Sequence, residues 1–460
     1  MRQIIIHIAT AALLCGCSVY RNFDCPEIAT DSLYRDAYSP NVVTDTVSLG
    51  DLSWREMFRD PKLQQLISQG IASNVDLQSA QLRVEQAAAT LMSARLAFVP
   101  SFTLSPEGAL SRYDGSTTKT YGIPLAASWE VDIFGSLRNA KQRSKAVLAQ
   151  SKAYRQAVQT QLVATIADGY YTLLMLDRQL AISRRTAENW KESVETMRSL
   201  KEAGIANEAA VTQSEASYRS VRASIPDLEY RIRETENALC SVLGQTPQKI
   251  DRGTWRTLEL PGAIATGIPL RLLSARPDIK QVEMALASAY YTTNEARATF
   301  YPRITINGTG SWTNNAGAVI ANPGKLLLSA VGSLVQPIFN RGLNRAKLRV
   351  AKAQQQEALL EFQQSLLNAG EEVSNACYRY TQSERKLAER REQLVALHGS
   401  VAATQELMRN GDATYLEVLT AQQSLLAAQL SESEDEFEQV AALVSLYRAL
   451  GGGREIEAQP

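Results

Sequence analysis

Two long stretches of the chain carry apolar residues at alternating steps of four and three, which is the spacing along one face of a packed helix. From Ser136 to Leu200 there is no proline and one glycine, Gly169. These 65 residues predict a helix of about 98 Å at 1.5 Å per residue. Its apolar seam comprises Leu162, Ile166, Gly169, Leu173, Leu176, Leu180, Ser183, Ala187, Trp190, Val194 and Met197.

A second seam repeats every seven residues further along the chain. It comprises Leu359, Leu366, Val373, Tyr380, Leu387, Leu394, Val401 and Met408. Many alanine, serine and glutamine residues lie between these positions, so we expect helices packed closely side by side. A simple coiled-coil rod would show the same seam, so the seam alone does not specify a function.

The two seams belong to an internal duplication of nearly the whole chain. The matching segments are 94–100 with 296–302, 132–135 with 337–340, 200–204 with 407–411, and 243–244 with 450–451. The offsets between partners are 202, 205, 207 and 207 residues. Each copy therefore predicts the same order of elements: helix, β-hairpin, very long helix, tight turn, helix.

Local signals place the boundaries of these elements. Asp60 and Pro61 suit the N-cap and first position of a helix, alternating apolar residues predict the hairpins, and Pro226 should break or bend its helix. The predicted divisions are a signal peptide 1–16, an extended segment 17–60, copy one 61–250 (hairpin 100–131, turn 203–207), a linker 251–274, copy two 275–452 (hairpin 302–338, turn 410–414) and a tail 453–460.

The first residues resemble the signal of a bacterial lipoprotein. Arg2 precedes an apolar stretch, Ile4 to Leu14, that is too short to span a membrane as a helix. Leu14-Cys15-Gly16-Cys17 then resembles a lipobox, with Cys17 as the lipidated residue and outer-membrane lipid as its surroundings. A plain secretory signal with incidental cysteines is the alternative.

Composition argues against several other functions. The chain has 48 Lys and Arg residues and 48 Asp and Glu residues. It therefore has no net positive charge that would favour binding to nucleic acid. Only His7 and His398 are histidines, and the five cysteines include no C-x-x-C pair. We therefore expect no enzyme, no metal site and no cofactor apart from the covalent lipid on Cys17.

The strand count implies assembly of several chains. Two hairpins supply four strands, which cannot close a barrel, and lipid does not tolerate an open sheet edge. Three chains supply twelve strands, an allowed size for an outer-membrane barrel. The sequence thus predicts an α+β membrane protein: a homotrimer with a 12-stranded β-barrel continued by a long periplasmic α-helical barrel.

Three motifs resemble the TolC-like outer-membrane efflux proteins, and specifically their lipoprotein branch. Residues 54–63 match W-x₃-F-x-D-P-x-L, residues 273–279 match R-R-P-D-I with Ala275 in place of the first arginine, and residues 411–425 match G-x₃-Y-L-x-V-L-x-A-x₃-L. The resemblance spans Trp54 to Gly453. It implies an equatorial belt formed by 17–60 and 251–274, a periplasmic adaptor protein and an inner-membrane transporter.

The same resemblance implies a passive duct that exports small molecules, such as drugs, toxic compounds or metal ions, through the outer membrane. The outer-membrane part of a type I protein secretion system is an alternative within the family. A periplasmic coiled-coil scaffold without a pore is an alternative of another class, and it would conduct no ions.

The tight turns are the predicted contact with the adaptor. Gly204 and Gly411 suit a helix end with positive φ, and Asn207 and Thr414 can cap the returning helices. Asp412 is the fifth predicted contact residue, and all five lie within the turns 203–207 and 410–414. Simple turn chemistry would explain the same residues.

The predicted periplasmic gate follows the second turn. In the family, gate residues lie five, six and nine positions after this glycine, which here gives Leu416, Glu417 and Thr420. Three copies of Glu417 would form a carboxylate ring, but Thr414-x-x-Glu417 is also a capping box, which could explain the residue by itself. Threonine at 420 departs from the usual aspartate, and copy one has Ala209, Ala210 and Gln213 at these positions.

Overall fold

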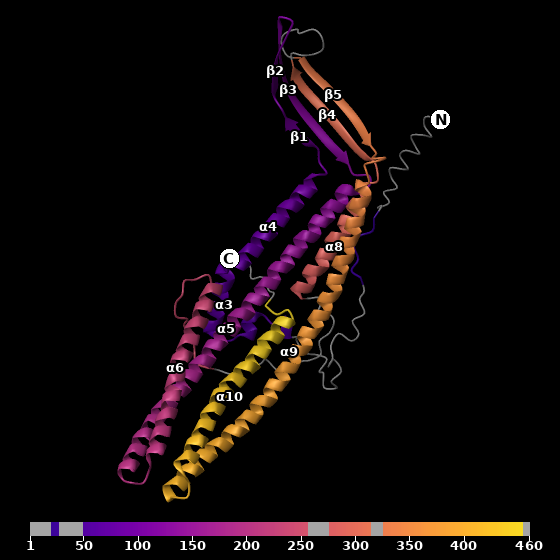
Figure 1. The fold of residues 1–460 in the computed structure, drawn as a ribbon. Coiled ribbons are helices and arrows are strands. Elements are labelled where there is room, and N and C mark those ends of the chain that lie inside the picture. The colour runs from indigo at the N-terminus through magenta and orange to yellow at the C-terminus, as the bar shows by residue number, and fades with distance from the viewer. Residues whose placement is uncertain (1–19, 27–48, 256–275, 314–324, 454–460) are drawn as a thin grey trace. The chain divides into compact units, whose positions relative to one another are not determined.

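The protein is described by a computed structural model that covers residues 20–26, 49–255, 276–313 and 325–453 (Figure 1). The signal peptide and Cys17 lie outside the described residues. Contacts between Cα atoms divide the chain into two compact units, and the long helices contribute to both. Of the described residues, one unit comprises 20–26, 82–153, 280–313 and 325–365, and the other comprises 49–81, 154–255, 276–279 and 366–453.

The first unit contains an antiparallel sheet in the order β1-β3-β4-β5, with β2 also paired to β3. The strands are β1 (Ser101–Leu104), β2 (Glu107–Tyr113), β3 (Ser116–Val131), β4 (Arg303–Thr313) and β5 (Lys325–Val335). The expected four strands are five because Pro106, which has no N–H, interrupts the first one. β1 and β2 pair with successive parts of β3, so together they occupy one edge of the sheet.

The β3–β4 pairing joins the two copies, from Gly122 opposite Thr313 to Val131 opposite Ile304. The helices that contribute to this unit are α4 (Val75–Leu96), α5 (Ser136–Glu202), α8 (Pro277–Ala298) and α9 (Leu343–Asn410). The α8 helix contacts one long helix of each copy. Glu295 accepts a 2.7 Å hydrogen bond from Arg143 of α5, and Thr293 donates a 3.1 Å bond to the Ala351 carbonyl of α9.

The second unit contains the hydrophobic core. Its elements are η1 (Leu49–Asp51), α2 (Trp54–Met57), α3 (Pro61–Ser73), α6 (Glu208–Val242), α10 (Tyr415–Ala449) and the remaining turns of α5 and α9. Its largest fully buried side chains include Trp54, Phe58, Leu63, Ile67, Ile166, Tyr170, Leu173, Leu243, Leu443 and Tyr447. Three of these are the apolar positions of the W-x₃-F-x-D-P-x-L motif, so the motif specifies core packing.

The long helices agree closely with prediction. The α5 and α9 helices have 67 and 68 residues, which corresponds to about 100 Å each. Most of their predicted seams are buried, including Ile166, Leu173, Val373 and Leu387. Among the helices that the structure describes, none is long and apolar enough to cross a membrane.

The start of the first helix is confirmed, since Asp60 accepts the Lys62 N–H at 2.9 Å and Pro61 is the first helical residue. This predicted single helix is instead two, α3 and α4. Asn74 ends α3, accepts the Leu77 N–H and donates to the Val242 carbonyl, both at 2.9 Å. The side chain therefore satisfies one N–H in the first turn of α4 and one carbonyl at the end of α6.

Two further expectations are wrong. The segment 17–60 is not wholly extended, because Ser53 and Glu56 form a capping box that starts α2. The α6 helix also continues through Pro226, so the expected break there is wrong, while a bend at this residue stays a prediction. A proline removes one N–H from the helix, and the remaining hydrogen bonds of 35 residues maintain it.

Candidate functional site

The two turns that join the long helices have the same backbone geometry. Gly204 and Gly411 have φ values of +76° and +87°. In each turn the glycine N–H donates to the carbonyl three residues earlier, and the next N–H donates to the carbonyl five residues earlier. These bonds are 2.9 and 2.8 Å in copy one and 3.1 and 2.9 Å in copy two. Both turns are therefore Schellman motifs, which explains the glycines.

Both helices that return from the turns have capped N-termini, by Asn207 as predicted in copy one and through Glu417 in copy two. In copy one, the Asn207 side chain accepts the Ala210 N–H at 2.9 Å. In copy two, the Glu417 carboxylate accepts the Thr414 N–H at 2.7 Å and the Thr414 hydroxyl at 3.3 Å. Glu417 thus forms a capping contact in the single chain, and its role as a gate residue stays a prediction.

The predicted gate positions are accessible in the chain. The Leu416 side chain is 61% exposed, although leucine is apolar. Glu417 and Thr420 are also exposed, and the Thr420 hydroxyl donates to the Leu416 carbonyl at 2.8 Å. Three side chains of different chemistry therefore lie on the first turns of α10.

The two turns differ at the residue after the glycine. Copy one has Ile205, whose side chain is 75% exposed, and copy two has Asp412, which is exposed as well. The shared backbone therefore presents an apolar side chain at one turn and a carboxylate at the other. Ile205 was not singled out as a site residue from the sequence, although its position beside Gly204 could have indicated it.

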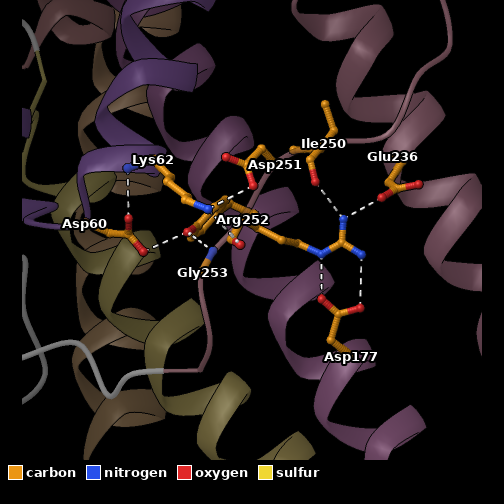
Figure 2. A network of polar contacts seen from close by, with 9 residues as sticks. Asp60, Lys62, Asp177, Glu236, Ile250, Asp251, Arg252 and Gly253 are labelled. Carbon is orange, nitrogen blue, oxygen red and sulfur yellow. Dashed lines mark hydrogen bonds and ion pairs between the residues drawn. The ribbon is translucent and has the colours of Figure 1, made fainter.

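A buried polar network fixes the chain where it leaves α6 (Figure 2). The Arg252 guanidinium donates two hydrogen bonds to Asp177 of α5, at 2.5 and 3.0 Å. It also donates to Glu236 of α6 and, at 2.9 Å, to the Ile250 carbonyl. Burial tends to lower the pKa of Arg252, but the bonds to Asp177 and Glu236 outweigh it, so the pKa is raised and the charge retained.

A second part of the network holds the start of α3 (Figure 2). The Tyr170 hydroxyl donates to Asp60 at 2.7 Å and accepts the Gly253 N–H at 3.2 Å. Burial, and next the bond to Asp60, raise the pKa of Tyr170. Lys62 forms a more exposed 2.8 Å ion pair with Asp251, whose pKa that bond lowers.

The start of copy two is held in a similar way. Arg276 of the R-R-P-D-I motif donates to Asp278 at 2.7 and 3.0 Å, to Glu372 of α9 at 2.6 Å and to the Ala449 carbonyl at 2.7 Å. Burial tends to raise the pKa of Asp278, but the bonds from Arg276 lower it. The motif therefore has a structural role.

Charged contacts also connect the two copies along the long helices. The α10 segment 432–438 carries five carboxylates. Arg178 of α5 pairs with Glu432 at 2.9 Å and with Glu436. From α9, Arg390 and Lys386 pair with Asp435, at 2.8 and 2.7 Å. This network could not be predicted from the sequence, because its partners come from three separate helices.

The described residues offer no metal centre. No group of three or more His, Cys, Asp or Glu side chains in this part of the chain is arranged to hold a metal ion. The geometry is that of long helices with capped turns and buried ion pairs. Such an arrangement provides a scaffold with two exposed tips.

Comparison with known proteins decides the family. The sequence profile of the outer membrane efflux protein family matches residues 66–245 and 268–452, one match for each copy. The chain belongs to this family. It is therefore an outer-membrane efflux component, as predicted, and the family is one of transport proteins, not a class of enzymes.

Individual relatives cover nearly the whole chain. The chain is 27% identical to the cation efflux system protein CusC of Escherichia coli O6:H1 over 458 residues, 98% of each protein. It is 29% identical to the toluene efflux pump outer membrane protein TtgC of Pseudomonas putida over 469 residues, 96% of this chain and 94% of TtgC. The structure of the outer-membrane channel OprN superposes with a TM-score of 0.83 at 28% identity, covering 95% of this chain and 98% of OprN. These matches confirm the α+β efflux-channel fold.

Proposed function

We propose that three copies of this chain form a passive export duct, which receives its cargo from a periplasmic adaptor and an inner-membrane transporter. The observation that carries the trimer is a set of exposed apolar stripes on α4 and α9. Since these stripes lie on different helices, one chain can offer its α9 stripe to the α4 stripe of the next. Contacts of this head-to-tail kind generate a closed ring when the rotation between neighbouring chains closes, as it would after three copies here.

The α9 stripe is separate from the buried seam of the same helix. Six of the seven large apolar residues exposed on α9 fall on only two positions of one heptad: Leu343, Val350, Leu360, Leu367, Tyr378 and Val395. Their exposed fractions run from 51% to 70%. A row of apolar residues with this spacing can pack against a second helix.

The α4 stripe has the same periodicity. Leu82, Met92 and Leu96 are 56%, 60% and 57% exposed, and they share two positions of one heptad. The sheet supports the same conclusion, since β1 with β2 forms one edge and β5 the other. We propose that three such sheets join edge to edge into a 12-stranded β-barrel, and that the helices form a periplasmic tube.

The trimer makes a testable prediction. The double substitution Val350→Asp with Leu360→Asp should weaken assembly, because unpaired carboxylates would be buried at each interface, at about 2 kcal/mol per site. Native mass spectrometry of the detergent-solubilised protein measures the trimeric fraction. Gln356→Asp with Gln363→Asp adds the same charge at exposed α9 positions off the stripe and should leave the trimer intact. Equal loss in both variants would contradict the proposed interface.

The duct and its gate are tested together in planar bilayers. A duct conducts ions, whereas a periplasmic scaffold conducts none. Glu417→Gln keeps an acceptor for the Thr414 N–H but removes the charge. If Glu417 forms a carboxylate ring, this variant should lower cation selectivity and weaken block by divalent cations. A variant that behaves as the parent would leave Glu417 with capping alone.

The proposed cargo is a small molecule, because the relatives CusC and TtgC are named for cation and toluene efflux. Export of proteins by a type I system is the second candidate.

Exposed Ile205 and Asp412 support the turns 203–207 and 410–414 as the adaptor contact. Site-specific photo-crosslinking from these two positions to a co-expressed adaptor would test the contact.

We further propose that Cys17 carries the lipid. The lipobox ending Leu14-Cys15-Gly16-Cys17 supports it. Each buried CH₂ of an acyl chain contributes about 0.8 kcal/mol to membrane anchoring. Cys17→Ser should abolish incorporation of labelled palmitate, and persistent labelling would contradict the assignment.

A further inference from the structure

Acidic residues are missing from the chain around the starts of both long helices. None occurs between Asp132 and Asp168, or between Glu295 and Glu357. The first turns of α5 and α9 fall within these intervals. Basic residues are frequent there, so the local charge is strongly positive in a chain whose net charge is zero.

Six of these basic side chains form what we call the basic surface. They are Arg138, Lys141 and Lys145 on α5, and Arg341, Arg345 and Lys347 at the start of α9, and all six are exposed. Within the described residues none of them forms an ion pair, whereas nearby Arg143 pairs with Glu295. The Lys141 ammonium lies 5.6 Å from the centre of the Phe98 ring.

Helix stability does not explain the basic surface. The macrodipole of an α-helix places positive potential at its N-terminus, so cations in the first turns are unfavourable. Two equivalent helices of the duplicated chain nevertheless accumulate them. An anionic partner outside the chain would account for the pattern.

The lipid anchor places a membrane surface near these helix starts. A methyl group at Gly135, just before α5, would lie 3.5 Å from the Tyr20 ring. Next to Gly135, the Phe134 ring stacks on Tyr301 at 5.0 Å. Two residues separate Tyr20 from Cys17, and the three Cα–Cα steps between them span at most about 11 Å.

Exposed apolar side chains lie in the same short connections between strands and helices. Ile338 and Phe339, between β5 and α9, are 94% and 85% exposed. Ile133, Phe300 and Tyr301 occupy corresponding connections and are 47%, 39% and 40% exposed. Exposed aromatic and apolar residues of this kind are typical of the membrane–water interface.

We propose that the basic surface binds the anionic phosphate headgroups of the periplasmic leaflet of the outer membrane. The proposal rests on the membrane-anchored function proposed above and adds a specific lipid contact to it. The apolar connections enter the interface, and the cations that follow them in α5 and α9 contact the phosphates. Headgroup binding of this type is electrostatic and therefore decreases with salt.

The test compares lipid preference in the full-length protein, reconstituted in phosphatidylcholine vesicles with 30% phosphatidylglycerol. Spin-labelled phosphatidylglycerol and spin-labelled phosphatidylcholine report the association of each lipid by electron paramagnetic resonance. The parent protein should prefer phosphatidylglycerol by at least about fivefold at low salt. The preference should fall towards one in the variant Arg138→Gln, Lys141→Gln, Arg341→Gln, Arg345→Gln.

The matched control removes four exposed cations of the second unit: Arg185→Gln, Lys191→Gln, Arg231→Gln, Arg233→Gln. It has the same net charge as the test variant and should keep the full preference. Loss of preference in both variants, or in neither, would overturn the proposal. Conductance of the same samples is measured separately: if the test variant alters ion selectivity but not lipid preference, the basic surface lines the duct and the headgroup proposal fails, while the proposed channel stands.

Discussion

Arg252→Met lowers the free energy of unfolding by about 3–5 kcal/mol, the expected result of removing one partner from a buried charge network. The Arg252 side chain is 8% exposed and that of Glu236 is 11% exposed, whereas that of Asp177 is 38% exposed, so most of the loss is expected from Glu236. Without the guanidinium, two carboxylates from α5 and α6 are left close together without their shared cation. Thermal and denaturant unfolding of the detergent-solubilised protein measure the change.

Lys62→Met is the matched control in the same network. The Lys62 and Asp251 side chains are 41% and 87% exposed, so water compensates for the lost ion pair and the change should stay below about 1 kcal/mol. Adding Asp177→Leu and Glu236→Leu to Arg252→Met should recover part of the lost stability, because no uncompensated charge remains. Equal losses of stability in Arg252→Met and Lys62→Met would show that the buried ion pairs of Arg252 contribute no more than the exposed pair of Lys62.

Gly50→Ala destabilises the second unit by roughly 3 kcal/mol through overpacking. An added Cβ would lie 2.3 Å from the Leu450 carbonyl oxygen, which belongs to the backbone and cannot turn aside. The 49–51 turn must then separate from the end of α10. Near this contact, the Tyr447 hydroxyl donates to the Leu52 carbonyl at 2.9 Å, so the separation also strains that hydrogen bond.

Gly399→Ala is the corresponding control within α9. No atom that the structure describes lies within 4 Å of an added Cβ there. Alanine is also favoured over glycine inside a helix by about 0.8–1 kcal/mol. The midpoint of thermal unfolding should therefore fall for Gly50→Ala and stay level or rise for Gly399→Ala. Similar midpoints in the two variants would contradict the close contact at Gly50.

Periodic signals made most of the helical architecture predictable. The α5 helix was expected to run from Ser136 to Leu200 and ends at Glu202, because a seam and the absence of proline act along the whole stretch. The turns at Gly204 and Gly411 were predictable for a related reason. Positive φ and N-capping depend on residues next to one another in the chain.

Features that depend on distant residues were not predictable. Arg252 binds Asp177, 75 residues away, and no spacing in the sequence links the two. The expected break at Pro226 is absent because the other hydrogen bonds of a long helix offset the cost of the proline. The interruption at Pro106 was not predicted. Pro106 also lacks an N–H, and it divides an edge strand, which has fewer hydrogen bonds than a long helix to offset the loss.

The interrupted edge of the sheet has a consequence for how the molecule is made. A newly exported chain presents one edge divided at Pro106 and another, β5, that is continuous for 11 residues. In the trimer proposed above, a pair of chains joined edge to edge would still have one edge of each kind exposed, and only the third chain would remove both. If the chain assembles in this way, incomplete assemblies are prone to add further chains or to aggregate. Biogenesis would then have to keep unassembled chains scarce or shield β5 until the proposed ring closes.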